Sequence, residues 1–285
     1  MRVSVVSDIH GNLEYLHRAA DRADFLIVLG DLLQYVDYRK PEAGIFGRVF
    51  GPHASAEFAA LRVSGRFDAM HSFERDLWMG LPDPAAVLAG AIREQYCAVV
   101  EVLGPRTLVT LGNVDSASEW NSLAPEGLRC RDAEIVELDG LRFGFVAGGA
   151  LREARGSGPW TFFERSHDHY RSIVESLGKV DVLCTHVPPD IKELRFDVVA
   201  QRSEMYGPGL LEAIDEHHPS YSLFGHVHRP RATVVRRGPT TCVNVGLLNH
   251  GGRAFGFDTD RLHADQESLI SRRTPRPRLR TSRRR

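Results

Sequence analysis

Short apolar segments that stop at Asp, Asn or His recur along most of the chain, and this pattern constrains the fold more than any other feature. Five segments end in the runs Asp8-Ile9-His10, Gly30-Asp31, Gly112-Asn113, Thr185-His186 and Gly225-His226-Val227-His228. In an open α/β sheet, ligands bind outside the carboxyl ends of the strands. We therefore expect the five runs to place their polar side chains in one crevice.

The first thirty residues predict a βαβ unit, in which the two strands are parallel neighbours. A β-rich run at 2–7 is followed by a helical pattern at 12–22 and by an apolar run at 25–29. Further strands are expected at 107–111, 133–138, 141–147, 180–184, 221–224, 231–236, 240–245 and 253–258, with helices at about 163–177 and 210–216. Asp139-Gly140 predicts a hairpin turn. This alternation of strands and helices indicates an α/β fold.

One folded domain is expected over residues 1–265. Within it, residues 34–104 open with a Gly/Pro-rich stretch and continue as helical patterns at roughly 54–79 and 84–103, the second beginning at Asp83-Pro84. We interpret this region as a helical insertion that lies over the site. Residues 266–285 are polar and Arg/Pro-rich, and they cannot bury enough apolar area to offset their chain entropy. We therefore expect a disordered tail.

The charge distribution disfavours a nucleic-acid-binding face on the folded part. The formal net charge is −1, but residues 272–285 contain eight Arg, which leaves 28 of the 36 basic residues against 37 acidic ones in the body. An acidic body makes nucleic acid a less favoured partner. No apolar run approaches the ~18 residues of a membrane helix, and the N-terminus lacks a signal-peptide pattern. We predict a cytoplasmic protein without membrane contact, whose four separated cysteines are reduced.

The residue types in the five runs suit a pair of divalent metal ions. They offer two carboxylates, four imidazoles and one amide oxygen, from Asp8, His10, Asp31, Asn113, His186, His226 and His228. Mixed nitrogen and oxygen ligands favour Mn, Fe, Zn or Co over Ca or Mg alone. Seven ligands are too many for one tetrahedral ion, but they suit two ions about 3.5–4 Å apart that share a carboxylate.

The order of these runs resembles the signature of the calcineurin-like metallophosphoesterase superfamily, which is D-x-H, G-D, G-N-H-[DE], H and G-H-x-H. Four of the five blocks match outright and the third matches in part, across residues 8–228. The resemblance implies a four-layer α/β/β/α sandwich and a phosphoric ester hydrolase. It also implies two ligand sets bridged by Asp31: Asp8, His10 and His228 for one ion, and Asn113, His186 and His226 for the other.

The resemblance implies that a water or hydroxide between the ions is the nucleophile. The predicted catalytic residues are Asp31, Asn113 and His226. The third block departs from the family pattern, because Val114 stands where the family often has a histidine that protonates the leaving group. Asp115 matches the acid that orients that histidine, so its partner is expected to be missing. General acid catalysis contributes roughly 10²–10⁴-fold. The departure therefore favours phosphodiester or nucleotide-like substrates over phosphomonoesters with poor leaving groups.

Two residues are candidate substrate contacts, Asn12 and His250. Asn12 is also placed to cap the helix that follows it, and we favour the cap slightly. His250 lies in a Gly-rich segment and is a candidate substitute for the absent acid. Besides a hydrolase of small phosphate esters, two alternatives remain open. One is a catalytically silent scaffold of the same fold that binds a protein partner, and the other is a nuclease that holds DNA with the Arg-rich tail.

Overall fold

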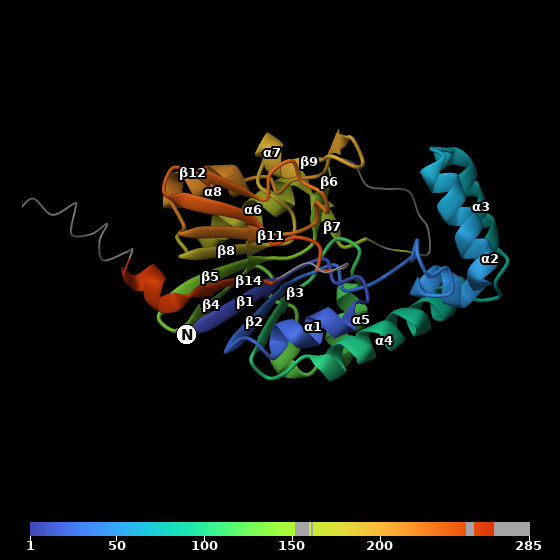
Figure 1. The fold of residues 1–285 in the computed structure, drawn as a ribbon, viewed down its shortest axis with the longest axis horizontal. Helices are drawn as coiled ribbons and strands as arrows, with labels where there is room; N and C mark the ends of the chain where they lie inside the picture. The colour runs from blue at the N-terminus through green and yellow to red at the C-terminus, as the bar shows by residue number, and fades with distance from the viewer. Residues whose placement is uncertain (152–159, 161, 249–253, 265–285) are drawn as a thin grey trace, which may run out of the picture.

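The protein is described by a computed structural model, which places residues 1–151, 160, 162–248 and 254–264 (Figure 1). His250 and the predicted disordered tail lie outside these described residues. Within the described ranges, no helix combines the length and the apolar character that crossing a bilayer requires.

The first of two large sheets carries the predicted βαβ unit. Among the described residues its strand order is β14 (Phe255–Asp258), β1 (Arg2–Val6), β2 (Phe25–Leu29) and β3 (Thr107–Thr110). β1, β2 and β3 are parallel, whereas β14 pairs with β1 in the antiparallel sense. α1 (Leu13–Ala20) connects β1 to β2, which confirms the βαβ prediction. The carboxyl ends of the three parallel strands therefore lie along one edge of the sheet.

The second sheet has the order β12 (Val234–Arg237), β13 (Thr240–Asn244), β11 (Tyr221–Phe224), β8 (Val182–Thr185), β5 (Leu141–Val146) and β4 (Glu134–Leu138). β11 is parallel to β8 and β13, and β8 is parallel to β5. β4 and β5 form the predicted hairpin. Its turn residues Asp139 and Gly140 have φ angles of 51° and 73°, as a two-residue hairpin turn with positive φ requires.

Alternate side chains of the strands pack on opposite faces of each sheet, and this produces four layers (Figure 1). Ile27 and Leu29 of β2 lie in the core between the two sheets, together with Phe143 and Leu223 of the second sheet. The outer face of the first sheet packs against α1, α4 (Pro84–Val102) and α5 (Ala117–Leu123). The outer face of the second sheet packs against α6 (His167–Leu177) and α8 (Leu210–His217). The predicted α/β/β/α architecture is confirmed.

The region 34–104 is helical, but the helix boundaries differ from the prediction. The prediction of a single helix at 54–79 is wrong, because α2 (Gly44–Val63) and α3 (Phe67–Met79) are separate helices. Gly65 lies between them with a φ of 72°. α2 begins before residue 54 and is kinked at Gly51-Pro52. A cluster around Phe46, Phe58 and Met70 holds α2 and α3 together. Figure 1 shows both helices beyond the carboxyl ends of the strands.

The remaining elements are short and were not expected. They are η1 (Glu126–Leu128), β6 (Gly149–Leu151), β7 (Glu164–Ser166), α7 (Lys192–Arg195), β9 (Phe196–Asp197) and β10 (Arg202–Ser203). β7 occupies the start of the helix predicted at 163–177, so that α6 begins only at His167, where Ser166 caps it.

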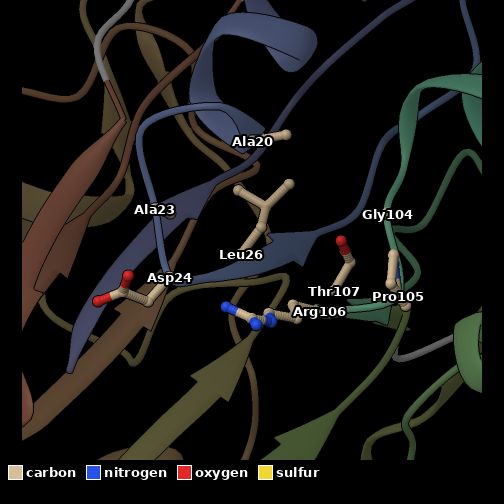
Figure 2. Close-up of a pocket in the computed structure, with 8 residues that line it drawn as sticks. All are labelled: Ala20, Ala23, Asp24, Leu26, Gly104, Pro105, Arg106 and Thr107. Carbon is tan, nitrogen blue, oxygen red and sulfur yellow. The ribbon is translucent and has the colours of Figure 1, made fainter.

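A surface pocket lies at the opposite edge of the first sheet, by the amino ends of β2 and β3 (Figure 2). Asp24, Leu26, Arg106 and Thr107 contribute to its lining. The Asp24 carboxylate already accepts a hydrogen bond from the backbone N–H of Arg2 at 2.8 Å. The lining contains none of the predicted ligands, so this pocket is separate from the strand ends that carry the candidate site.

Candidate metal centre

All seven predicted ligands follow the carboxyl end of a strand, and the loops of the two sheets meet there. The first sheet supplies Asp8, His10, Asp31 and Asn113, and the second supplies His186, His226 and His228. The backbone N–H of His226 donates to Asp8 Oδ2 at 3.0 Å. The ring of His186 donates through Nδ1 to the carbonyl oxygen of Leu29 at 2.8 Å. The predicted convergence of distant loops is therefore present in the structure.

The ligand atoms form two clusters that share one carboxylate. Within each cluster the atoms lie within 4.8 Å of one another, and the members are Asp8, His10, Asp31 and His228 in one, and Asp31, His186 and His226 in the other. Asn113 adjoins the second cluster, because its Oδ1 lies 3.1 Å from His186 Nε2 and 3.0 Å from His226 Nδ1. The carboxylate of Asp31 thus belongs to both clusters.

Several nitrogen and oxygen atoms of these side chains lie close together, and two of them have no hydrogen-bond partner in the part of the chain that the structure describes. The Nε2 atoms of His10 and His228 are 3.1 Å apart. Asp8 Oδ1 is 3.2 Å from His228 Nε2. Among the described residues, Asp8 Oδ1 and His226 Nε2 are buried side-chain atoms without a hydrogen-bond partner. Buried unsatisfied groups are rare and need an explanation, and coordination of cations by these lone pairs provides one. The residues therefore fit a metal pair.

The backbone at the centre is strained. Asp8, His10, Asp31 and His226 have φ angles of 54°, 42°, 52° and 67°. Such conformations cost non-glycine residues of order 1–3 kcal/mol each and concentrate at functional sites. A left-handed residue after β1, β2 and β11 turns the chain sharply, which lets the side chain point back toward the other loops.

Two of the imidazoles are oriented by backbone carbonyls. Nδ1 of His10 donates to the oxygen of Leu33 at 2.9 Å, and Nδ1 of His186 donates to the oxygen of Leu29. When Nδ1 carries the proton, the neutral ring presents the lone pair of Nε2 to the cluster. Carbonyl partners of this kind fix both the tautomer and the ring position of metal-binding histidines.

Burial and the neighbouring charges shift the pKa values at the centre in opposite directions, and which effect is larger differs between residues. Burial lowers the pKa of His186, but the Asp31 and Asp8 carboxylates and the Leu29 carbonyl together more than compensate and raise this pKa to about 9. Burial raises the pKa of Asp31, yet His186 and His10 hold it well below its usual value. Burial dominates at His226 and lowers its pKa to about 3. Without a cation, these charges favour an ionised Asp31 and a protonated His186, and a bound cation would displace this proton.

Asp115 lacks the histidine partner of the family pattern, because residue 114 is valine, but its carboxylate accepts backbone hydrogen bonds that the sequence did not reveal. Its Oδ1 accepts from the backbone N–H groups of Leu32 and Leu33 at 3.0 and 3.2 Å, and its Oδ2 accepts from that of Gly112 at 2.8 Å. The carboxylate thereby joins the loop after β2 to the loop after β3. The backbone N–H of Val114 donates to Asp31 Oδ1 at 3.2 Å.

Of the two candidate substrate contacts, Asn12 belongs to neither cluster. Asn12 is the N-cap of α1, where its Oδ1 accepts from the backbone N–H of Tyr15 at 3.5 Å. This position agrees with the favoured interpretation of Asn12 as a cap, and its contact with substrate stays a prediction. His250 lies outside the described residues.

The chain belongs to the calcineurin-like phosphoesterase family, whose model matches residues 1–230. Metal-dependent phosphoesterases make up this family, together with some catalytically inactive members. No curated protein matches the sequence. One solved structure superposes with a TM-score of 0.58 at 16% identity, covering 91% of this chain and 95% of that chain. Another, TT1561 of Thermus thermophilus, has a TM-score of 0.52 at 13% identity, with 90% and 98% covered. At such identities these structures support the fold alone.

Proposed function

We propose that this protein hydrolyses small phosphate esters with two divalent cations held at the candidate metal centre. The observation that carries the proposal is the position of Asp31, whose two oxygens face different clusters. Its Oδ1 lies 3.3 Å from His186 Nε2, and its Oδ2 lies 3.9 Å from His10 Nε2. A shared carboxylate is what two cations about 3.5–4 Å apart require. Membership of a phosphoesterase family supports the same activity.

When bound, a cation pair lowers the pKa of a water nucleophile and neutralises charge that develops on the phosphoryl oxygens. The residues of the chain set the positions. Asp31 would bridge two ligand sets, which are Asp8, His10 and His228, and Asn113, His186 and His226. The mixture of imidazole nitrogen and carboxylate or amide oxygen suits manganese, iron or zinc.

Val114 bears on the class of substrate. A valine side chain cannot donate a proton to a departing alkoxide, so the reaction should depend strongly on the leaving group. General acid catalysis is typically worth about 10²–10⁴-fold. We therefore favour phosphodiester or nucleotide-like substrates over phosphomonoesters with poor leaving groups, with Asn12 and His250 as candidate substrate contacts.

The test is a hydrolysis assay on protein that has been stripped of metal and reloaded with manganese, iron, zinc or magnesium. Bis-p-nitrophenyl phosphate, p-nitrophenyl phosphate, cyclic nucleotides and DNA serve as substrates. Asp31→Ala removes the bridge, and Asp21→Ala is its matched control, because Asp21 pairs with His17 on the surface at 3.0 Å. His226→Ala and His17→Ala form the second pair.

We expect Asp31→Ala to lower kcat/KM by more than about 10³-fold, since a metal pair supplies several kcal/mol of transition-state stabilisation. His226→Ala should also be strongly impaired, whereas both surface controls should retain wild-type rates. Full activity in the Asp31 and His226 variants would disprove the assignment of the centre. Metal binding without turnover of any substrate would instead identify a silent scaffold, and turnover confined to DNA would identify a nuclease.

A further inference from the structure

The loop that carries His228 is paired along its backbone with a segment from another part of the chain. This segment, residues 196–200, contains β9 and the turn that follows it. The N–H of Val198 donates to the carbonyl of Arg229 at 2.8 Å, and the N–H of Arg231 donates to the carbonyl of Phe196 at 3.1 Å. Asp197 and Pro230 form an antiparallel bridge between these bonds. The pairing therefore begins at the residue directly after His228.

The carboxylate of Asp197 joins the segment to the same loop. Asp197 is only 7% exposed. Its Oδ1 accepts from the backbone N–H groups of Val199 and Ala200, both at 2.8 Å, and its Oδ2 accepts from the N–H of Arg229 at 3.0 Å. Hydrogen bonds to an ionised carboxylate are stronger than neutral ones. One oxygen thus shapes the 197–200 turn, while the other fixes the backbone beside His228.

His228 depends on such support more than the other histidine of its cluster. Its side chain is 41% exposed, compared with 17% for His10. The ring of His10 is also tied by Nδ1 to the carbonyl of Leu33. Within the described part of the chain, Nδ1 of His228 has no corresponding carbonyl partner. The ring of His228 is therefore held through Nε2, by Asp8 and His10, and through the backbone that carries it, which Asp197 holds on one side.

We propose that Asp197 is a positioning residue for the metal site formed by Asp8, His10, Asp31 and His228. It binds no metal itself. It holds the N–H of Arg229, and this bond keeps His228 Nε2 beside Asp8 Oδ1, at 3.2 Å. The inference rests on the proposed two-cation function and adds that one of the two cation positions depends on Asp197. Among the residues that the structure describes, the hydrogen bonds of Asp197 reach Val199, Ala200 and Arg229 but not Asn113, His186 or His226, so we expect the position formed by those three residues to depend on it less.

The experiment is a titration of metal-free protein with Mn²⁺. Calorimetry measures the heat of binding, and electron paramagnetic resonance measures the concentration of unbound Mn²⁺. Asp197→Asn is the main variant, because its amide oxygen still accepts from Val199 and Ala200 while its NH₂ group faces the N–H of Arg229. Asp197→Ala removes all three bonds. Asp83→Ala is the control, since Asp83 also accepts a backbone N–H, from Ala86 at 3.0 Å, but at the start of α4.

We expect Asp197→Asn to bind one Mn²⁺ as the wild type does and the other about 10–100-fold more weakly, as is typical when a supporting residue of a metal ligand is replaced. His228→Ala should weaken the same cation, and the double variant should be little worse than His228→Ala alone. The thermal midpoint of the metal-free Asp197→Asn variant should stay close to that of Asp83→Ala.

Two results would overturn the inference while leaving the proposed function intact. The first is wild-type binding of both cations by Asp197→Asn and Asp197→Ala. The second is equal weakening of both cations, or full additivity with His228→Ala, because either result would indicate a general loss of structure. If the wild-type protein binds fewer than two cations, the proposed function fails, and the inference about Asp197 fails with it.

Discussion

Replacing Gly112 with alanine tests whether the loops after β2 and β3 must approach as closely as they do. A Cβ at residue 112 would lie 2.0 Å from Asp31 Oδ1 and 2.4 Å from the backbone nitrogen of Asp31. Rotation of the Asp31 side chain relieves the first clash but not the second, so the backbone of one loop must move. Because ordinary contact begins at 3.4 Å and the nitrogen is at 2.4 Å, the required movement is about 1 Å.

This movement has a stability cost and a larger functional cost. Overpacking a close-packed site typically destabilises a protein by about 1–3 kcal/mol. Metal–ligand distances are held to about 0.2 Å, so a displacement of about 1 Å takes Asp31 out of bonding range. Since Asp31 belongs to both clusters, we expect Gly112→Ala to weaken the binding of both cations, in contrast to the single loss expected at Asp197.

Two measurements separate these effects. Denaturant unfolding of the metal-free protein gives the stability cost, and titration with Mn²⁺ gives the loss of affinity. The control is Gly90→Ala in α4, where a Cβ meets no atom within 4 Å. This control should stabilise the protein by roughly 0.5–1 kcal/mol, because alanine favours a helix interior. Wild-type affinity for two Mn²⁺ ions in Gly112→Ala would refute the argument from close approach.

The other predictions concern the cysteines and the pH dependence of stability. Cys97 is exposed, whereas Cys130, Cys184 and Cys242 are buried, and burial raises the pKa of Cys130 to about 12. A thiol reagent should therefore label one of the four cysteines in the native protein and all four after denaturation; rapid labelling of a second native thiol would contradict the packing. The proton on His186 stabilises the metal-free fold fully below pH 6.5, and this contribution is lost as the pH rises through about 9, since Asp31 raises the folded-state pKa. We expect the thermal midpoint of the wild type, measured with a chelator present, to fall as the pH rises over this interval, and that of His186→Asn to fall less. A wild-type thermal midpoint that does not change with pH over the interval would contradict the prediction.

The strands and the candidate ligands were predictable because both depend on local sequence. The apolar runs at 25–29 and 221–224 coincide with β2 and β11. Each run ends where the next polar residue has to leave the sheet, so the positions of Asp31 and His226 follow from the same pattern. Parallel strands then bring these ends to one edge without any knowledge of tertiary contacts.

The supporting contacts were not predictable, because they join segments that are far apart in the chain. Asp115 bonds to Leu32 and Leu33, and Asp197 bonds to Arg229, yet nothing in the local sequence identifies either pair. β9 has only two residues, which is too short to show periodicity. The break between α2 and α3 is different, because Gly65 marks it in the local sequence. The helical pattern at 54–79 was interpreted as continuous in spite of this glycine.

The division of the candidate ligands between the two sheets has a consequence for the stability of the fold. Each cluster takes members from both sheets: His228 completes one that is otherwise from the first sheet, and Asp31 completes one that is otherwise from the second. Neither sheet supplies every member of a cluster. A cation held by these side chains would connect the two sheets, so its binding free energy would stabilise the whole sandwich and not one sheet alone.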